Sequence, residues 1–143
     1  MQHATYLDKL IDAGFVYAGR WTKQEFNLEL DLGKPGIYAL VENDEIKFIG
    51  KTERDLDVRL HSHRRRAEDA ETNKRKPLHY RLAETIYGNR AVEIYVLLCA
   101  DQVTMWRGLP VDVLSGLEAA LIRQLDPPYN RADRVNPRVR LAA

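Results

Sequence analysis

At 143 residues, 45% of them hydrophobic and 30% charged, the chain is long enough for one soluble domain with a buried core. It has no run of 18 apolar residues, no signal-peptide pattern and one cysteine, Cys99, which exclude a membrane span, a disulfide framework and a cysteine-rich zinc site and predict a cytoplasmic protein. The net charge of +1 conceals a local excess, because residues 59–81 hold eight Arg or Lys and three Asp or Glu, which suits a phosphate backbone.

The N-terminal segment 1–35 holds too few apolar residues for a core of its own, so it is predicted to be an accessory part of the same domain. Apolar residues recur at helical spacing over 4–14, and Gly14 supplies a helix end. An extended segment follows at 15–17. Apolar and polar residues alternate over 26–32, which is typical of a half-buried strand.

Residues 36–52 form the clearest pattern in the chain. Two short apolar runs flank the polar turn 42–45, which predicts a β-hairpin. A helix is predicted to begin at Thr52-Glu53-Arg54-Asp55, which resembles a capping box. Leu56 and Leu60 then follow at the i, i+4 spacing of an apolar helix face.

Helical and extended patterns alternate further along the chain. Polar residues over 67–76 predict the end of the preceding helix and a solvated loop. Pro77 is suited to open the next helix and Gly88 to end it. The apolar run 92–99 predicts a central strand, and 101–114 is predicted to be irregular.

The last predicted helix begins at a second capping-box pattern, Ser115-Gly116-Leu117-Glu118. It carries a stripe of leucines and stops at Pro127-Pro128. The tail 131–143 is rich in arginine and lacks periodicity, which predicts loose order.

The predicted hairpin contains Gly36-Ile37-Tyr38 in its first strand and Phe48-Ile49-Gly50 in its second, and polar residues follow in a set order. These are Arg59 and His63 one helical turn apart, then Glu118, and then Asn130 after a proline-containing turn. In this order they resemble the GIY-YIG nuclease family over residues 36–130, with Phe48 where the family usually has tyrosine. The resemblance implies a nuclease-like core at 36–130, between the accessory segment and the basic tail.

The resemblance implies an α+β (α/β) fold, with a small central mixed or antiparallel sheet flanked by helices. It also implies an endonuclease that hydrolyses phosphodiester bonds with one divalent ion, Mg²⁺ or Mn²⁺, and DNA as the expected substrate. Such hydrolysis needs a group that activates water, cations that neutralise charge on the phosphate, and an oxygen ligand for the metal. The expected roles are water activation by Tyr38, charge stabilisation by Arg59, Lys51 and His63, metal binding by Glu118, and bracing of the site by Asn130.

Several of these residues also have a purely structural interpretation. Tyr38, in an alternating strand, could simply pack against the core. Glu118, three residues after Ser115, could only bond back to the helix cap. Asn130 could be a turn former. For His63, a phosphate contact and a role in proton transfer both remain open.

A basic run after Arg59 is expected to follow the nucleic-acid backbone, although such a run can also be a plain solvated face. Its members are Arg64, Arg65, Arg66, Lys74, Arg75 and Lys76. The sequence Gly50-Lys51-Thr52 does not indicate a nucleotide-binding phosphate loop, because Glu45 stands where that motif requires a glycine.

Phe48 keeps an aromatic ring but lacks the hydroxyl of the usual tyrosine. Tyr38 alone could then serve as the base, Lys51 or His63 could take over the polar role, or the protein could bind nucleic acid without cutting it. Because Arg59 and Glu118 are both present, an active enzyme is expected, with a binding module as the alternative. The sequence leaves open the strandedness of the substrate, the choice between DNA and RNA, and the oligomeric state.

Overall fold

In the computed structural model, which describes residues 6–69, 77–98 and 103–134, the stretch 36–52 forms the predicted hairpin. Its strands are joined by a two-residue turn at Asn43 and Asp44, whose φ angles are 52° and 62°. Such a turn needs positive φ at both central residues, and Asn and Asp tolerate that conformation better than most side chains. The turn chemistry of the sequence therefore fixes the register of this hairpin.

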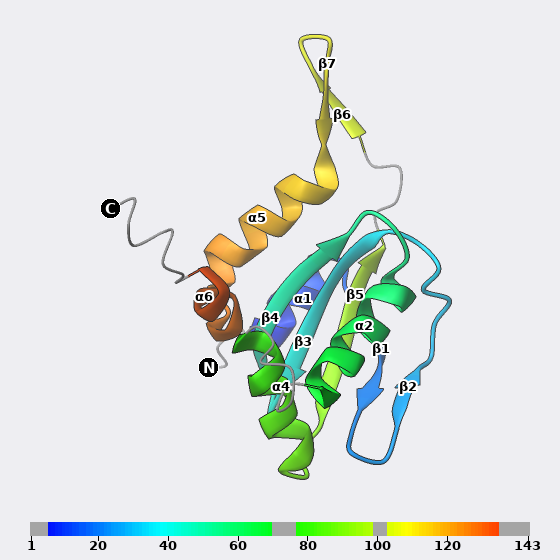
Figure 1. Ribbon diagram of the computed structural model, residues 1–143. Helices are drawn as coiled ribbons and strands as arrows, with labels where there is room; N and C mark the ends of the chain where they lie inside the picture. The colour runs from blue at the N-terminus through cyan, green and yellow to red at the C-terminus, as the bar shows by residue number, and fades with distance from the viewer. Residues whose placement is uncertain (1–5, 70–76, 99–102, 135–143) are drawn as a thin grey trace.

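The hairpin lies at one side of an antiparallel sheet with strand order β2-β1-β5-β3-β4 (Figure 1). The strands are β1 (Val16–Trp21), β2 (Phe26–Leu28), β3 (Gly36–Glu42), β4 (Glu45–Thr52) and β5 (Val92–Leu98). The predicted central strand is β5, which pairs with both β1 and β3. Through β1 and β2, the accessory segment belongs to the same sheet, and β4 is left as an edge strand.

Helices cover both faces of this sheet. They are α1 (Tyr6–Asp12), α2 (Leu56–Glu68), α4 (Pro77–Tyr87), α5 (Val113–Leu125) and α6 (Pro128–Arg134). One buried cluster joins Tyr38 and Phe48 to α2 and α4, and a second joins Ile37 and Ile49 to α1 and α5. Neighbouring residues of β3 thus serve opposite cores, as a strand requires. The structure confirms the predicted α+β fold, with every strand pair antiparallel.

Helix α2 begins at Leu56, so the predicted start at a Thr52 capping box is wrong. Thr52 remains the last residue of β4. The first backbone N–H groups of the helix, those of Leu56 and Asp57, donate to the carbonyl oxygens of Lys34 and Leu32. The first N–H groups of a helix have no partner within the helix, and here loop carbonyls, rather than the predicted capping side chain, accept their hydrogen bonds.

The prediction of irregular structure over 101–114 is also wrong, because β6 (Val103–Trp106) and β7 (Leu109–Asp112) form a second hairpin that leads directly into α5 (Figure 1). Its turn residues, Arg107 and Gly108, have φ angles of 50° and 84°. Pro110 in β7 hid the strand pattern, because a proline argues against a strand in the middle of a sheet. It is tolerated here because this hairpin has no third strand within the described residues, so β7 is an edge strand.

The first residues of the predicted tail are helical, which the sequence did not predict. Pro127 and Pro128 end α5 as expected, but Pro128 also opens α6, where the missing N–H costs nothing. Residues 135–143 of the predicted tail, and Cys99, lie outside the described residues. No helix in the described part of the chain is both long and apolar enough to cross a membrane.

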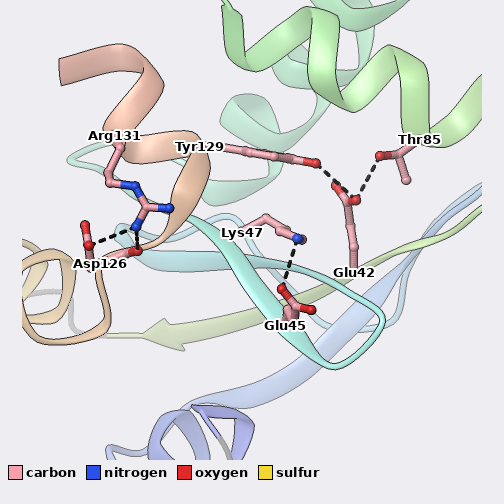
Figure 2. Close-up of polar contacts among 7 residues, drawn as sticks. All are labelled: Glu42, Glu45, Lys47, Thr85, Asp126, Tyr129 and Arg131. Atoms are coloured by element: carbon pink, nitrogen blue, oxygen red, sulfur yellow. Dashed lines mark hydrogen bonds and ion pairs between the residues drawn. The ribbon is translucent and has the colours of Figure 1, made fainter. Parts of the chain in front are cut away.

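A buried carboxylate holds α6 against the hairpin (Figure 2). Glu42, at the end of β3, accepts hydrogen bonds on Oε1 from Thr85 of α4, at 2.8 Å, and from Tyr129 of α6, at 3.1 Å. Burial and the charge of Glu42 raise the pKa of Tyr129 to about 12, so its hydroxyl remains a donor at neutral pH. This contact sets the position from which α6 reaches the edge of β4.

Candidate active site

The structure joins Tyr38 and His63 directly. The Tyr38 side chain leaves β3 on the face covered by α2, and its Oη lies 2.6 Å from Nε2 of His63. Both residues are buried. His63 thus faces the phenol and the core, although the sequence placed it one turn from Arg59, which is exposed. Of the two predicted roles for His63, this geometry favours proton transfer over a phosphate contact.

The Phe48 ring packs against both Tyr38 and His63. Its ring centroid lies 6.1 Å from that of Tyr38 and 5.9 Å from that of His63. The residue supplies packing but no polar atom. The hydrogen-bond partner of the Tyr38 hydroxyl is instead Nε2 of His63. An unprotonated Nε2 can accept the Tyr38 proton.

Gly50 provides the space for the Tyr38 phenol. The two residues are direct partners across the β3–β4 ladder. A Cβ at position 50 would overlap with Oη and Cζ of Tyr38 and also press on the Phe48 ring. The requirement for glycine here is therefore steric.

Replacement of Gly50 by Ala is expected to displace Tyr38 and to lower the free energy of unfolding by about 1–3 kcal/mol, because it overpacks a filled site. Gly116→Ala is the matched control, since its Cβ would meet no atom within 4 Å; it lies inside α5 and should stabilise the fold by about 0.5–1 kcal/mol. Urea unfolding of both variants measures the difference, and equal stability of the two would contradict the steric role of Gly50.

Glu118, Lys51 and Arg59 form the second part of the site. Burial raises the pKa of the Glu118 carboxyl above its usual value, and the charges of Lys51 and Arg59 lower it in part. Lys51, the last but one residue of β4, lies two residues after Ile49 and so on the α5 face, whereas Arg59 comes from α2 on the other face. Cationic side chains from both sides of the edge strand thus favour the ionised form of the half-buried Glu118 carboxylate.

The structure rules out the predicted capping box at Ser115. The N-cap of α5 is Asp112, whose carboxylate accepts from Leu114 N at 3.0 Å and from Ser115 Oγ at 2.8 Å. Glu118 therefore lies in the second turn of α5, beyond the first-turn position from which a side chain can reach back to the cap. Its carboxylate is left available for another partner.

The Glu118 carboxylate suits a divalent cation. Among the described residues it makes no hydrogen bond or ion pair, and Lys51 pairs instead with Glu53 at 3.6 Å. The same residues contain no group of three or more His, Cys, Asp or Glu side chains that could hold a metal ion. A hard cation bound here would take one carboxylate from the protein and its remaining oxygens from water or substrate, as Mg²⁺ commonly does.

Asn130 bridges the free edge of β4. Its Oδ1 accepts from Ile49 N at 2.8 Å, and its Nδ2 donates to Ile49 O at 2.9 Å. The amide thus takes the place of a sixth strand at the residue between Phe48 and Gly50. It is buried, and it makes a specific bridge rather than a turn.

Asn130→Ala is expected to lower the free energy of unfolding by roughly 1–3 kcal/mol, because it leaves a buried N–H and C=O of Ile49 without partners. Asn130→Asp should also destabilise the protein, since a carboxylate oxygen would then face the Ile49 carbonyl. Chemical unfolding checks both variants. Gln124→Ala, at an exposed position of α5, is the control and should change stability by less than about 0.5 kcal/mol; an Asn130→Ala variant as stable as this control would refute the bridge.

The predicted basic run divides into parts with different surroundings. Arg64 pairs with Glu68 at 3.0 Å and lies over the Phe26 ring, on the flank of α2 that faces β2. Arg65 and Arg66 are exposed, and Arg66 lies two helical turns after Arg59, on the same flank. Lys74, Arg75 and Lys76 lie outside the described residues.

His79 is a polar residue of this region that the sequence analysis missed. It belongs to α4, is 2% exposed, and its Nε2 lies 3.2 Å from Nδ1 of His63. A signal was present, since His79 precedes Leu82 by three residues and Ile86 by seven, and therefore lies on the apolar stripe of the helix. A histidine on such a stripe must find a polar partner in the core.

The fold has known counterparts. The structure of a mutant of EndoII from bacteriophage T4, a GIY-YIG nuclease, superposes with a TM-score of 0.69 at 17% sequence identity, covering 89% of this chain and 98% of that chain. The restriction endonuclease HPY188I in complex with product DNA superposes with a TM-score of 0.53 at 13% identity, covering 88% and 82%. The GIY-YIG N-terminal endonuclease domain of UvrC from Thermotoga maritima, bound to its catalytic divalent cation, gives 0.45 at 23% identity, covering 70% and 86%.

No protein-family model and no curated protein sequence matches the chain. The similarity is therefore one of fold: the chain has a GIY-YIG-like fold, as the resemblance in its sequence predicted.

Proposed function

We propose that the protein is a metal-dependent endonuclease that hydrolyses phosphodiester bonds in DNA, and that it acts in the cytoplasm. The proposal rests on one observation, the arrangement of two chemical groups around the end of the β3–β4 hairpin. One is a buried phenol bonded to an imidazole, Tyr38 and His63. The other is a carboxylate, Glu118, that lies near two cations and is not used by the helix cap.

Tyr38 is proposed to accept the proton of the attacking water. A free tyrosine has a pKa of about 10 and is a poor base while it keeps its own proton. His63 addresses this problem, because its Nε2 lies within hydrogen-bond distance of the phenol oxygen. Tyr38 can pass its proton to the imidazole as it takes one from water, which is general-base catalysis through a hydrogen-bonded pair.

Arg59 and Lys51 are proposed to stabilise negative charge on the phosphate as the P–O bond to water forms. A guanidinium suits two phosphate oxygens at once, and an ammonium acts as a point charge. Glu118 is proposed to hold one Mg²⁺ or Mn²⁺ ion, which when bound would supply further charge neutralisation to the phosphate. Asn130 keeps the edge strand in place, and Arg65 and Arg66 are candidates for backbone contacts beyond the site.

The structural neighbours support DNA as the substrate class. A restriction endonuclease with the same fold is bound to product DNA, and T4 EndoII is a nuclease of this fold. The alternative function is a nucleic-acid-binding module without cleavage, which Phe48 favours because it removes one hydroxyl from the site. The bond between Tyr38 and His63 argues for the enzyme, since a module that only binds nucleic acid has no need of a buried phenol–imidazole pair.

A substrate panel tests the proposal. The purified protein is incubated with single-stranded, nicked and supercoiled DNA and with RNA, each with Mg²⁺, Mn²⁺ or a chelator. The proposal predicts metal-dependent cleavage with DNA preferred over RNA. Retardation of DNA on a gel at low salt, without cleavage of any substrate under any metal condition, would establish the binding module instead.

A further inference from the structure

We propose that His79 is a positioning residue that fixes the tautomer of His63, so that the unprotonated Nε2 of His63 faces the hydroxyl of Tyr38. The inference rests on the proposed function for its catalytic consequence. It concerns His79, a buried residue of α4. It adds a third side chain, from α4, to the pair formed by Tyr38 of β3 and His63 of α2.

The three side chains form a continuous chain of short contacts. Tyr38 Oη lies 2.6 Å from His63 Nε2, and His63 Nδ1 lies 3.2 Å from His79 Nε2. The two imidazole centroids are 5.4 Å apart, as are those of the phenol and the His63 ring. The exposed fractions are 2% for Tyr38, 6% for His63 and 2% for His79. Polar side chains that are this buried lose free energy when they are left unpaired, so both contacts are expected to be hydrogen bonds.

Each contact holds one hydrogen, which couples the protonation of the three rings. A neutral phenol that donates to His63 Nε2 requires His63 to carry its proton on Nδ1. That N–H then points at His79 Nε2, which must be an acceptor. The reverse order, with His79 donating to His63 and His63 donating to the phenol oxygen, would leave no lone pair to receive the Tyr38 proton. Only the first order allows Tyr38 to serve as a base.

The reaction then balances without a further co-reactant. Water loses a proton to Tyr38 Oη and forms the new P–O bond, Tyr38 passes its own proton to His63 Nε2, and the scissile P–O bond breaks as the leaving oxygen takes a proton from solvent. His63 is now an imidazolium whose Nδ1–H is bonded to His79. An acceptor at the far nitrogen of a histidine holds both its tautomer and its ring orientation, and His79 Nε2 is such an acceptor when it carries no proton.

Nuclear magnetic resonance tests the assignment without any substrate. Long-range ¹H–¹⁵N spectra of the uniformly labelled full chain report which ring nitrogen of His63 carries the proton. The expected result at a pH above the imidazole titration is a protonated Nδ1 and an unprotonated Nε2. In His79→Leu the His63 signals should move toward the other tautomer or a mixture, whereas His79→Gln should keep the wild-type pattern, because its amide oxygen can accept from Nδ1–H.

Kinetics of DNA cleavage supply the second arm. His79→Leu should lower kcat roughly 10- to 100-fold and change KM by no more than about twofold, whereas His79→Gln should recover kcat to within about threefold of wild type. His61→Gln is the matched control, because His61 lies on the same helix as His63 but pairs with Asp57 at the surface; it should match wild type.

A His63 ring protonated on Nε2 in the wild type would overturn the inference, and so would a His79→Leu variant with wild-type kcat. If His79→Leu does not fold, the wild-type spectrum and the Gln variant still decide the question. Failure of the wild type to cut any nucleic acid would instead reject the proposed function, and the tautomer would still be read from the spectrum.

Discussion

The Glu118→Gln variant is expected to lose at least about 100-fold of its cleavage rate, because the amide keeps the shape of the side chain but removes the charge that holds a divalent cation. The same change should stabilise the fold. Burial raises the pKa of Glu118, so folding disfavours its ionised form. The resulting penalty is absent below the ordinary pKa of glutamate, grows as the pH rises through the raised value, and is then constant.

Thermal unfolding measures this second effect. At neutral pH Glu118→Gln should have a Tm equal to or above that of wild type, and Mg²⁺ should raise the Tm of wild type but not that of the variant, since a ligand stabilises only a fold that binds it. Glu84→Gln, at an exposed position of α4, is the control and should leave both cleavage and Tm unchanged. A Glu118→Gln protein that cuts DNA at the wild-type rate would place the metal elsewhere.

Tyr38→Phe is expected to lower the cleavage rate by about 10²- to 10⁴-fold, the range typical of a lost general base. The substitution removes one oxygen atom and keeps the buried ring, so the β3–β4 packing persists. It leaves His63 Nε2 without its partner at 2.6 Å, which should cost about 1–2 kcal/mol of unfolding free energy. Single-turnover cleavage under saturating metal measures the effect on the chemical step.

Tyr129→Phe separates catalysis from stability in this test. Tyr129 is also a buried tyrosine of the same cluster, and its hydroxyl bonds to Glu42. It should lose about 1 kcal/mol of stability while keeping its cleavage rate at a temperature where it is fully folded. Equal losses of cleavage in both variants would mean that Tyr38 acts only through packing.

Local patterns of the sequence predicted the elements that depend on local interactions. The turn at Asn43 and Asp44, the stripe from Leu78 to Ile86 and the apolar run that forms β5 are examples. The errors lie where distant groups decide the structure. The start of α2 depends on loop carbonyls from Lys34 and Leu32, and a short polar sequence such as Thr52-Glu53-Arg54-Asp55 cannot reveal them.

The candidate site shows the same limit. The resemblance to the GIY-YIG family was enough to select Glu118 and Arg59, and the structure brings their charges together with that of Lys51. The sequence could not show that His63 points inward to Tyr38. His63 lies one helical turn from the exposed Arg59, and the sequence does not say which of the two side chains faces the core. His79 was missed because its importance arises from α2 and α4 packing side by side, a contact between residues 16 apart in the chain.

The most direct test of the central claim is the conversion of supercoiled plasmid DNA by the wild-type protein, followed on a gel with Mg²⁺ or Mn²⁺ and after addition of a chelator. The proposed function predicts nicked and then linear products with either metal, no product with the chelator, and no product from Glu118→Gln prepared in parallel. Plasmid that stays supercoiled with every metal, although the protein retards it on the gel, would contradict it and identify a protein that binds DNA without cutting it.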